Sequence, residues 1–100
     1  MDARYGSRHH GTFIKLSGQS DKQVLRSARS YYINVVEHKA KIFNPSSYVE
    51  NWEGRGKNYK AGIAKKWQKD IDRNQELFEI ALEILRERGL EDEWRAILKQ

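Results

Sequence analysis

The sequence predicts a mainly α-helical single domain, built as a helical hairpin or small bundle with one short extended segment near its N-terminus. Two long stretches, 20–43 and 58–88, repeat apolar residues at helical spacing. Pro45 is the only proline in the 100 residues, so neither stretch is interrupted by one. A chain of this length can bury one modest core. We therefore expect a flexible arm over residues 1–11 and one helical domain over residues 12–100.

The extended segment is expected directly after the arm. Residues 12–16 (TFIKL) alternate and have the β-branched and aromatic content of a strand. The sequence offers no second convincing strand. This segment is therefore expected to pair with the arm or with a second copy of the chain, or to lie extended on the helices.

The first long helix has clear start and stop signals. Ser20 and Gln23 form a capping box, and Asp21 adds favourable charge in the first turn. Pro45 disfavours helical angles at the residue before it, so the helix should end near Phe43 or Asn44. The expected apolar face comprises Val24, Leu25, Ala28, Tyr31, Tyr32, Val35 and Ile42.

The second long helix follows a loop over residues 54–57. Ser47 and Glu50 suggest a weaker capping box over a short helical turn before that loop, and Asn58 is expected to cap the long helix. Gly89 should end it in a Schellman-type turn closed by Leu90. The expected apolar stripe comprises Tyr59, Ile63, Trp67, Ile71, Phe78, Ala81 and Leu85.

The length of this helix is unusual for so small a domain. A helix over 59–88 would span about 45 Å, against a radius of gyration of about 13 Å for a compact domain of this size. It must protrude, bend or break, and Asp72 with Gln75 offers a restart signal that predicts a kink near Asn74. A short last helix should begin at residues 91–93, with Trp94 on its apolar edge.

Charge is sorted along the sequence. Residues 1–42 sum to +5, residues 43–75 to +3 and residues 76–100 to −3. Such asymmetry favours a polyanion as partner, although clustered cations also fit an ordinary solvated surface. We expect the nucleic-acid-binding cations to converge into one patch, and aromatic residues beside them either pack in the core or stack on bases. These cations are Lys22, Arg26 and Arg29 on the first helix, Lys65, Lys66, Lys69 and Arg73 on the second, and Arg55, Lys57 and Lys60 in or beside the loop.

Several classes of protein are disfavoured. The chain has no cysteine, which excludes disulfides and thiolate metal sites. No apolar run reaches the roughly 18–20 residues of a membrane span, and the N-terminus lacks the apolar core of a secretion signal. The loop around Arg55 does not fit the P-loop template. We expect a cytoplasmic protein that has no cofactor, no metal ion and no membrane partner.

The histidines allow a catalytic interpretation. Metal-independent RNA cleavage needs a base, an acid and a cation for the phosphate. His38 and His10 could act as acid and base, with Lys41 or Arg29 holding the phosphate. A packed helical histidine and a polar arm explain the same residues without catalysis. The spacing of His9, His10, His38 and Glu37 does not fix two metal ligands on one face.

A family resemblance rests on residues that stop or pack helices, namely His38, Lys41, Ile42, Asn44, Pro45, Tyr48, Val49 and Trp52, then Trp67, Lys69, Asp70 and Ile71. In these residues the chain resembles small helical domains at the C-termini of phage head-morphogenesis and bacterial polymorphic-toxin proteins, over roughly residues 10–85. The resemblance implies an effector of phage or interbacterial conflict, for which RNA is a common target. Many ribonuclease effectors of that kind use a sheet-centred fold, whereas this chain offers at most one good strand.

Two functions follow as hypotheses. The first is a small basic effector that engages nucleic acid, RNA above all, with or without ribonuclease toxin activity. The second is a non-enzymatic inhibitor or adaptor that docks its basic face on an acidic protein surface. An unpaired strand and an overlong helix also suggest a homodimer.

Overall fold

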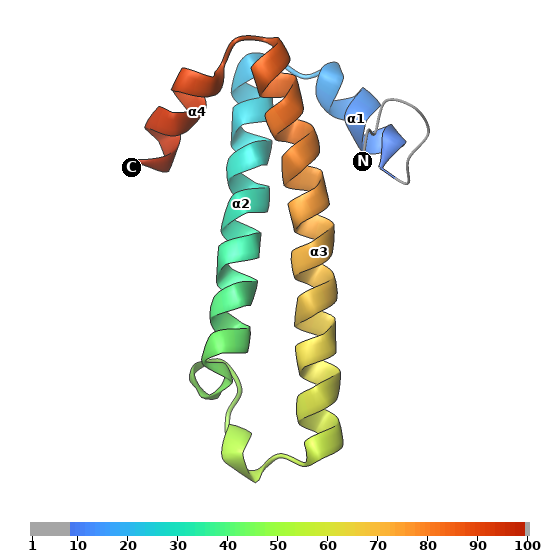
Figure 1. Ribbon diagram of the computed structural model, residues 1–100, viewed down its shortest axis with the longest axis vertical. Coiled ribbons are helices and arrows are strands. Elements are labelled where there is room, and N and C mark those ends of the chain that lie inside the picture. The colour runs from blue at the N-terminus through green and yellow to red at the C-terminus, as the bar shows by residue number, and fades with distance from the viewer. Residues whose placement is uncertain (1–8, 100) are drawn as a thin grey trace.

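The computed structural model describes residues 9–99. The elements of this range, in order, are α1 (His10–Ser17), α2 (Asp21–Phe43), the 3₁₀ turns η2 (Pro45–Ser47) and η3 (Trp52–Gly54), α3 (Lys57–Glu87) and α4 (Glu91–Leu98). The described residues include no strand. The mainly α-helical class is confirmed (Figure 1).

Helices α2 and α3 form an antiparallel hairpin, as predicted (Figure 1). Three contacts fix its register: Arg88 with Asp21 near the open end, Asn34 with Asn74 in the middle, and His38 with Asp70 towards the loop. Helices α1 and α4 flank the open end on opposite sides of the hairpin. The molecule measures 49 × 34 × 17 Å, so it is long and flat.

The ends of α2 confirm the predicted signals. The Ser20 hydroxyl accepts from the Gln23 N–H at 3.3 Å, and the Gln23 side chain accepts from the Ser20 N–H at 3.1 Å. The helix ends at Phe43, two residues before Pro45. The predicted helical turn between Ser47 and Glu50 is wrong: 3₁₀ turns lie on either side of it instead. The side-chain amide of Asn44 donates to the Ser47 hydroxyl at 2.7 Å, which closes the first of these turns.

Helix α3 covers Lys57–Glu87, so both of its ends lie one residue before those of the predicted range 58–88. Gly56 is its N-cap and no side chain caps it, so the Asn58 cap is wrong. At the other end, Leu90 N–H donates to the Leu85 carbonyl at 2.8 Å and Gly89 N–H to the Arg86 carbonyl at 3.1 Å. These two bonds, with Gly89 at φ +72°, make a Schellman motif.

Helix α3 is long enough to extend well beyond the core at the open end of the hairpin. It is one unbroken helix of 31 residues, so the restart signal of Asp72 and Gln75 does not interrupt it near Asn74. The Asn74 amide group donates to the Asp70 carbonyl one turn back, and its oxygen accepts from Asn34 of α2 at 3.3 Å, so its polar atoms are satisfied without interrupting the helix. The radius of gyration is 16.3 Å, above the value of about 13 Å for a compact chain of this length.

The N-terminal segment is where the prediction fails most. Residues 12–16 are helical in α1, not extended. A lone strand leaves its backbone groups without partners, whereas a helix bonds them internally. Leu16 is buried and Phe13 packs against the core, a three-residue spacing that suits one helical face. The predicted arm lies mostly outside the described residues, and its last two, His10 and Gly11, begin α1.

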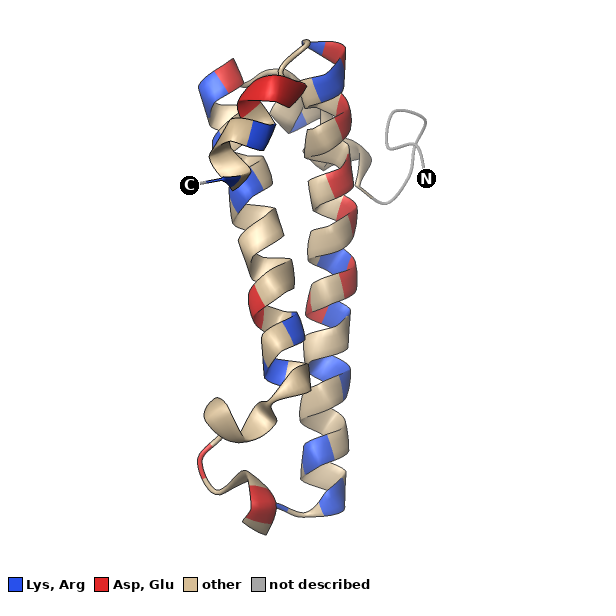
Figure 2. Cartoon of the chain, turned by 60° about the vertical axis from the view of Figure 1, so that its left-hand side comes forward, with Lys and Arg blue, Asp and Glu red and all other residues tan. Residues whose placement is uncertain are grey.

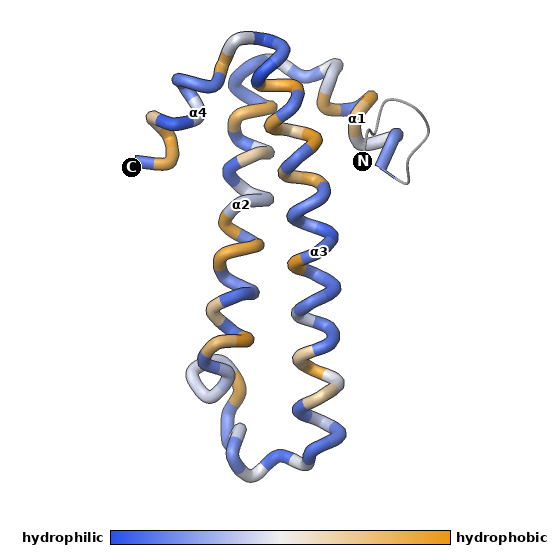
Figure 3. Tube along the Cα trace, in the orientation of Figure 1, coloured by the Kyte–Doolittle hydropathy of each residue, from blue (hydrophilic) through white to orange (hydrophobic). Residues whose placement is uncertain are grey.

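The core sits at the open end, where all four helices of the described range meet. It is built from Leu16, Val24, Ala28, Ile80, Ala81, Ile84, Leu85 and Trp94. Trp94 of α4 makes an edge contact with Tyr32 and a tilted contact with Phe78, which anchors the last helix as predicted. Towards the loop the buried residues thin to Val35, Trp67 and Ile71, and the loop half of α3 is largely hydrophilic (Figure 3).

Candidate nucleic-acid interface

The hairpin concentrates positive charge at its loop end. Residues 39–69, which we call the basic loop end, hold eight Lys or Arg against two Asp or Glu, a balance of +6. The whole chain carries +5, so the other 69 residues together contribute −1. Figure 2 shows blue segments dominating the lower part of both long helices, while blue and red mix at the open end. The eight cations are Lys39, Lys41, Arg55, Lys57, Lys60, Lys65, Lys66 and Lys69.

The cations predicted from sequence fall into two groups along the hairpin. Because the helices are antiparallel, Lys22, Arg26 and Arg29 lie beside the acidic C-terminal half of α3, at the open end. The pairing of His38 with Asp70 places Lys66 near the level of residue 42, about 20 Å along the axis from Arg29. Arg73 lies between the two groups. The remaining six predicted cations, from Arg55 to Lys69, belong to the basic loop end, and α2 adds Lys39 and Lys41.

Aromatic rings of the basic loop end contact one another and two of its cations. Trp52 of η3 stacks on Trp67 of α3 with ring centroids 6.3 Å apart and planes at 24°. The Lys60 ammonium lies 5.5 Å from the Trp52 ring, and the Arg55 guanidinium lies 4.8 Å from the Tyr59 ring. These cation–π contacts orient two of the eight cations without neutralising them. Trp67 is buried, so the expectation that it packs in the core is confirmed.

Other rings at the same end face solvent. Phe43 is 91% exposed, Tyr48 52% and Tyr59 41%. They come from the end of α2, the connection and the start of α3, so they surround the loop end on three elements. An exposed aromatic face among cations provides what a single-stranded nucleic acid needs, a stacking surface for bases and charge for phosphates. Phe43 and Tyr48 were not identified as binding residues from the sequence, because helical spacing and a neighbouring proline explain them as packing residues.

His38, the predicted catalytic residue, lies in the seam between the long helices. Its Nδ1–H donates to the carbonyl oxygen of Asn34 at 2.7 Å, and its Nε2 faces the Asp70 carboxylate at 3.4 Å. The side chain is 18% exposed. Both ring nitrogens are therefore engaged with the hairpin itself, which is the arrangement of a residue that holds two helices together.

The other proposed catalytic residues lie on different elements. Lys41 follows His38 by one turn on α2, within the basic loop end, and His10 begins α1 at the open-end half of α3. Its neighbour His9 pairs with Glu76 of α3. Neither His10 nor Lys41 is a hydrogen-bonding or ion-pair partner of His38. His38 therefore contacts neither of the other two predicted catalytic residues through a hydrogen bond or an ion pair.

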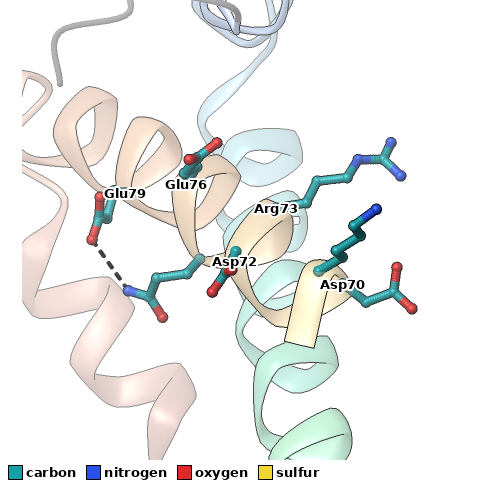
Figure 4. Close-up of a pocket in the computed structure, with 7 residues that line it drawn as sticks. Asp70, Asp72, Arg73, Glu76 and Glu79 are labelled. Carbon is teal, nitrogen blue, oxygen red and sulfur yellow. Dashed lines mark hydrogen bonds between the residues drawn. The ribbon is translucent and has the colours of Figure 1, made fainter. Parts of the chain in front are cut away.

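A shallow hollow of about 630 Å³ on α3 marks the acidic border of the basic loop end. Figure 4 shows its side chains fanning outward rather than converging, with Gln75 hydrogen-bonded to Glu79 at 3.3 Å. Four carboxylates against two cations make it a poor site for phosphate. The charged groups that line it are Lys69, Asp70, Asp72, Arg73, Glu76 and Glu79.

Within residues 9–99, no three His, Asp or Glu side chains are grouped so that they could hold a metal ion. No helix of that range is long and apolar enough to span a bilayer. Comparisons with protein-family models, with curated proteins and with solved structures found no match.

Proposed function

We propose that the basic loop end binds single-stranded nucleic acid, with RNA as the favoured target. One observation carries this proposal: a charge balance of +6 and the exposed rings of Phe43, Tyr48 and Tyr59 occur at the same end of the molecule. Cations alone would fit any polyanion. Cations interleaved with exposed rings favour strands whose bases are free to stack.

The geometry suggests how a strand would lie. Lys39 lines the same groove as Phe43, and the other cations of the basic loop end follow along α2, the loop and α3, so phosphates could follow these cations while bases reach the rings. Arg55 and Lys60 are already oriented by aromatic contacts, so less side-chain entropy is lost when they bind a phosphate. Because each contact is to backbone or to a ring face, we expect weak sequence preference.

The decisive experiment compares two charge-matched variants. Fluorescence anisotropy would follow a labelled single-stranded RNA of about 12 nucleotides. The triple variant Lys57→Gln, Lys65→Gln, Lys66→Gln should bind about tenfold or more weakly, because three phosphate contacts are lost. The control Lys22→Gln, Arg26→Gln, Arg29→Gln removes the same charge at the open end and should bind nearly as wild type. Equal losses in both variants would mean that net charge alone drives binding.

The salt response and the fate of the RNA complete the experiment. Wild-type affinity should fall steeply between about 50 and 200 mM salt, since counterions are released on binding, and a flat response would contradict the proposal. The RNA should stay intact on a denaturing gel, because both nitrogens of His38 are engaged with the hairpin. Cleavage that disappears in His38→Ala would replace binding with the ribonuclease hypothesis. The family resemblance would place either activity in a phage-related or toxin-related effector acting on cytoplasmic RNA.

An acidic protein partner is the second candidate, and a specific feature supports it. An apolar groove of about 290 Å³ runs between α2 and α3 at the basic loop end, lined by Lys39, Ile42, Phe43, Gln68 and Ile71. An acidic amphipathic helix could place its apolar face there and its carboxylates on the lysines. Ile42 lines this groove and is 36% exposed, whereas the RNA contacts proposed above are made by cations and by exposed rings. Ile42→Ser therefore separates the two partners: it should weaken binding of a protein partner and spare RNA.

The same groove supports a homodimer. Phe43 protrudes beside a groove that it also helps to line, so a two-fold axis nearby would let each Phe43 fill the groove of the other copy. An unpaired strand edge does not support the dimer, because residues 12–16 are helical. We propose that the dimer forms through this face and competes with RNA, because the Phe43 ring cannot at once fill the partner's groove and stack on a base.

A further inference from the structure

We infer that the cavity enclosed by α1, α2 and α3 binds a small phosphorylated sugar or nucleotide. The cavity has a volume of about 300 Å³ and lies on the α1 side of the hairpin, away from the groove of Phe43. Side chains of three elements line it: Thr12 and Lys15 of α1, Gln19 of the following turn, Ser27 and Tyr31 of α2, and Arg73 of α3. This site is separate from the basic loop end and goes beyond the proposed function.

The cations of the cavity are not neutralised. Lys15 and Arg73 come from different helices and border the same space. Neither forms an ion pair with a carboxylate in residues 9–99. The remaining titratable neighbour, His9, is paired with Glu76, so that carboxylate is already engaged. Two unpaired cations at a concave polar site favour a dianion such as a phosphate monoester.

A buried acceptor adds a second requirement. The side-chain oxygen of Gln19 is buried and has no hydrogen-bond partner, the sole such side-chain atom in the part of the chain that the structure describes. Buried polar atoms are nearly always paired, so this oxygen lacks a donor. After a rotation of the Gln19 side chain towards the cavity that it borders, this oxygen would accept from a sugar hydroxyl or a base amino group, whereas a fully ionised phosphate ester has no proton to donate. The hydroxyls of Thr12, Ser27 and Tyr31 supply further partners for a polyol.

The size of the cavity limits the ligand. Small-molecule sites span about 300–1,000 Å³, so this one is at the lower end of that range. It suits a sugar monophosphate or a single nucleotide rather than a dinucleotide. The same chemistry occurs in a free metabolite and in the 5′-phosphorylated end of an RNA, and the experiment must distinguish them.

Ribose 5-phosphate is the probe for the free ligand, titrated into the ¹⁵N-labelled full chain and followed by NMR. We expect saturable shifts of the amides of Gln19, Ser27 and Tyr31, and at least a tenfold loss of affinity in Lys15→Gln and in Arg73→Gln. Lys22→Gln, an exposed cation outside the cavity, is the matched control and should bind as wild type. Gln19→Leu should keep affinity for inorganic phosphate but lose the preference for ribose 5-phosphate.

The outcomes are separable from those of the RNA proposal. Absence of saturable shifts with both probes, or equal losses in Arg73→Gln and Lys22→Gln, would overturn the inference. The triple variant of the basic loop end should bind ribose 5-phosphate normally even though it fails to bind RNA. An RNA that shifts the cavity amides only when it carries a 5′-phosphate, with no shift from ribose 5-phosphate, would replace the free ligand with an RNA end. Circular dichroism should show that each variant keeps the helical fold, because the substituted cations are exposed and do not pack in the core.

Discussion

At the residue scale, Gly89 shows how one backbone angle ends the longest helix. It lies at φ +72°, in the left-handed region that side chains with a Cβ disfavour. Its position lets Leu90 bond back to the Leu85 carbonyl and turn the chain into α4. The sequence signal was sufficient here, because the cap is a local feature of three consecutive residues.

We predict opposite effects for the same substitution at two glycines. Gly89→Ala should lower the free energy of unfolding by about 1 kcal/mol, since alanine is strained at positive φ. Gly62→Ala should raise it by up to about 1 kcal/mol, because Gly62 lies inside α3 with nothing within 4 Å of an added Cβ. Urea denaturation measures both. Destabilisation by both substitutions to the same extent would contradict the assigned cap.

His38 illustrates a residue whose role the sequence could not decide. Histidine at the edge of an apolar stripe is compatible with catalysis or with packing, and only the positions of Asn34 and Asp70 distinguish them. The Asn34–Asn74 pair and the His38–Asp70 pair lie in successive turns of the seam. Polar pairs of this kind can fix the register of two helices, because a slip would leave them unpaired.

At the element scale, α1 is the element that the sequence predicted wrongly. Five residues of alternating pattern predict a strand, but a segment this short fits either period. The helix is favoured because α1 can bury Leu16 against the open end of the hairpin while its backbone bonds internally. No local feature of residues 12–16 reveals that surface.

A pair of substitutions tests the helix against the strand. In a strand Ile14 and Leu16 would share a face, whereas in α1 Ile14 is 58% exposed and Leu16 is 2% exposed. Leu16→Ala should therefore cost about 2–5 kcal/mol of unfolding free energy, and Ile14→Ala close to none. Thermal or urea unfolding provides the measurement. Similar costs at both positions would favour the extended segment.

At the scale of the whole molecule, flatness and charge segregation go together. A hairpin only 17 Å thick cannot cover both faces of its own helices, so Val36 and Phe43 stay exposed. Its loop half has little core to bury, which leaves that half free to carry a charge balance of +6. Binding and self-association are therefore both expected at the loop end.

The homodimer gives a prediction at this scale. Sedimentation should show a dimer for wild type at micromolar concentration and a monomer for Phe43→Glu, because a charge replaces the ring that fills the partner's groove. Ile14→Glu is the matched control: Ile14 is also exposed, lies on α1, and should leave the dimer intact. A wild-type monomer at all concentrations would rule the dimer out.

The sequence by itself determined the two long helices and the short last helix, the Ser20 capping box, the Gly89 turn and the excess of cations. These depend on residues within about one turn of each other, so local spacing is enough to read them. Only the tertiary structure decided that the cations fall into separate groups, that residues 12–16 are helical, and that Lys15, Gln19 and Arg73 border one cavity. Each of these depends on the register of two antiparallel helices and on which remote surface a segment covers, and no spacing along the chain encodes that.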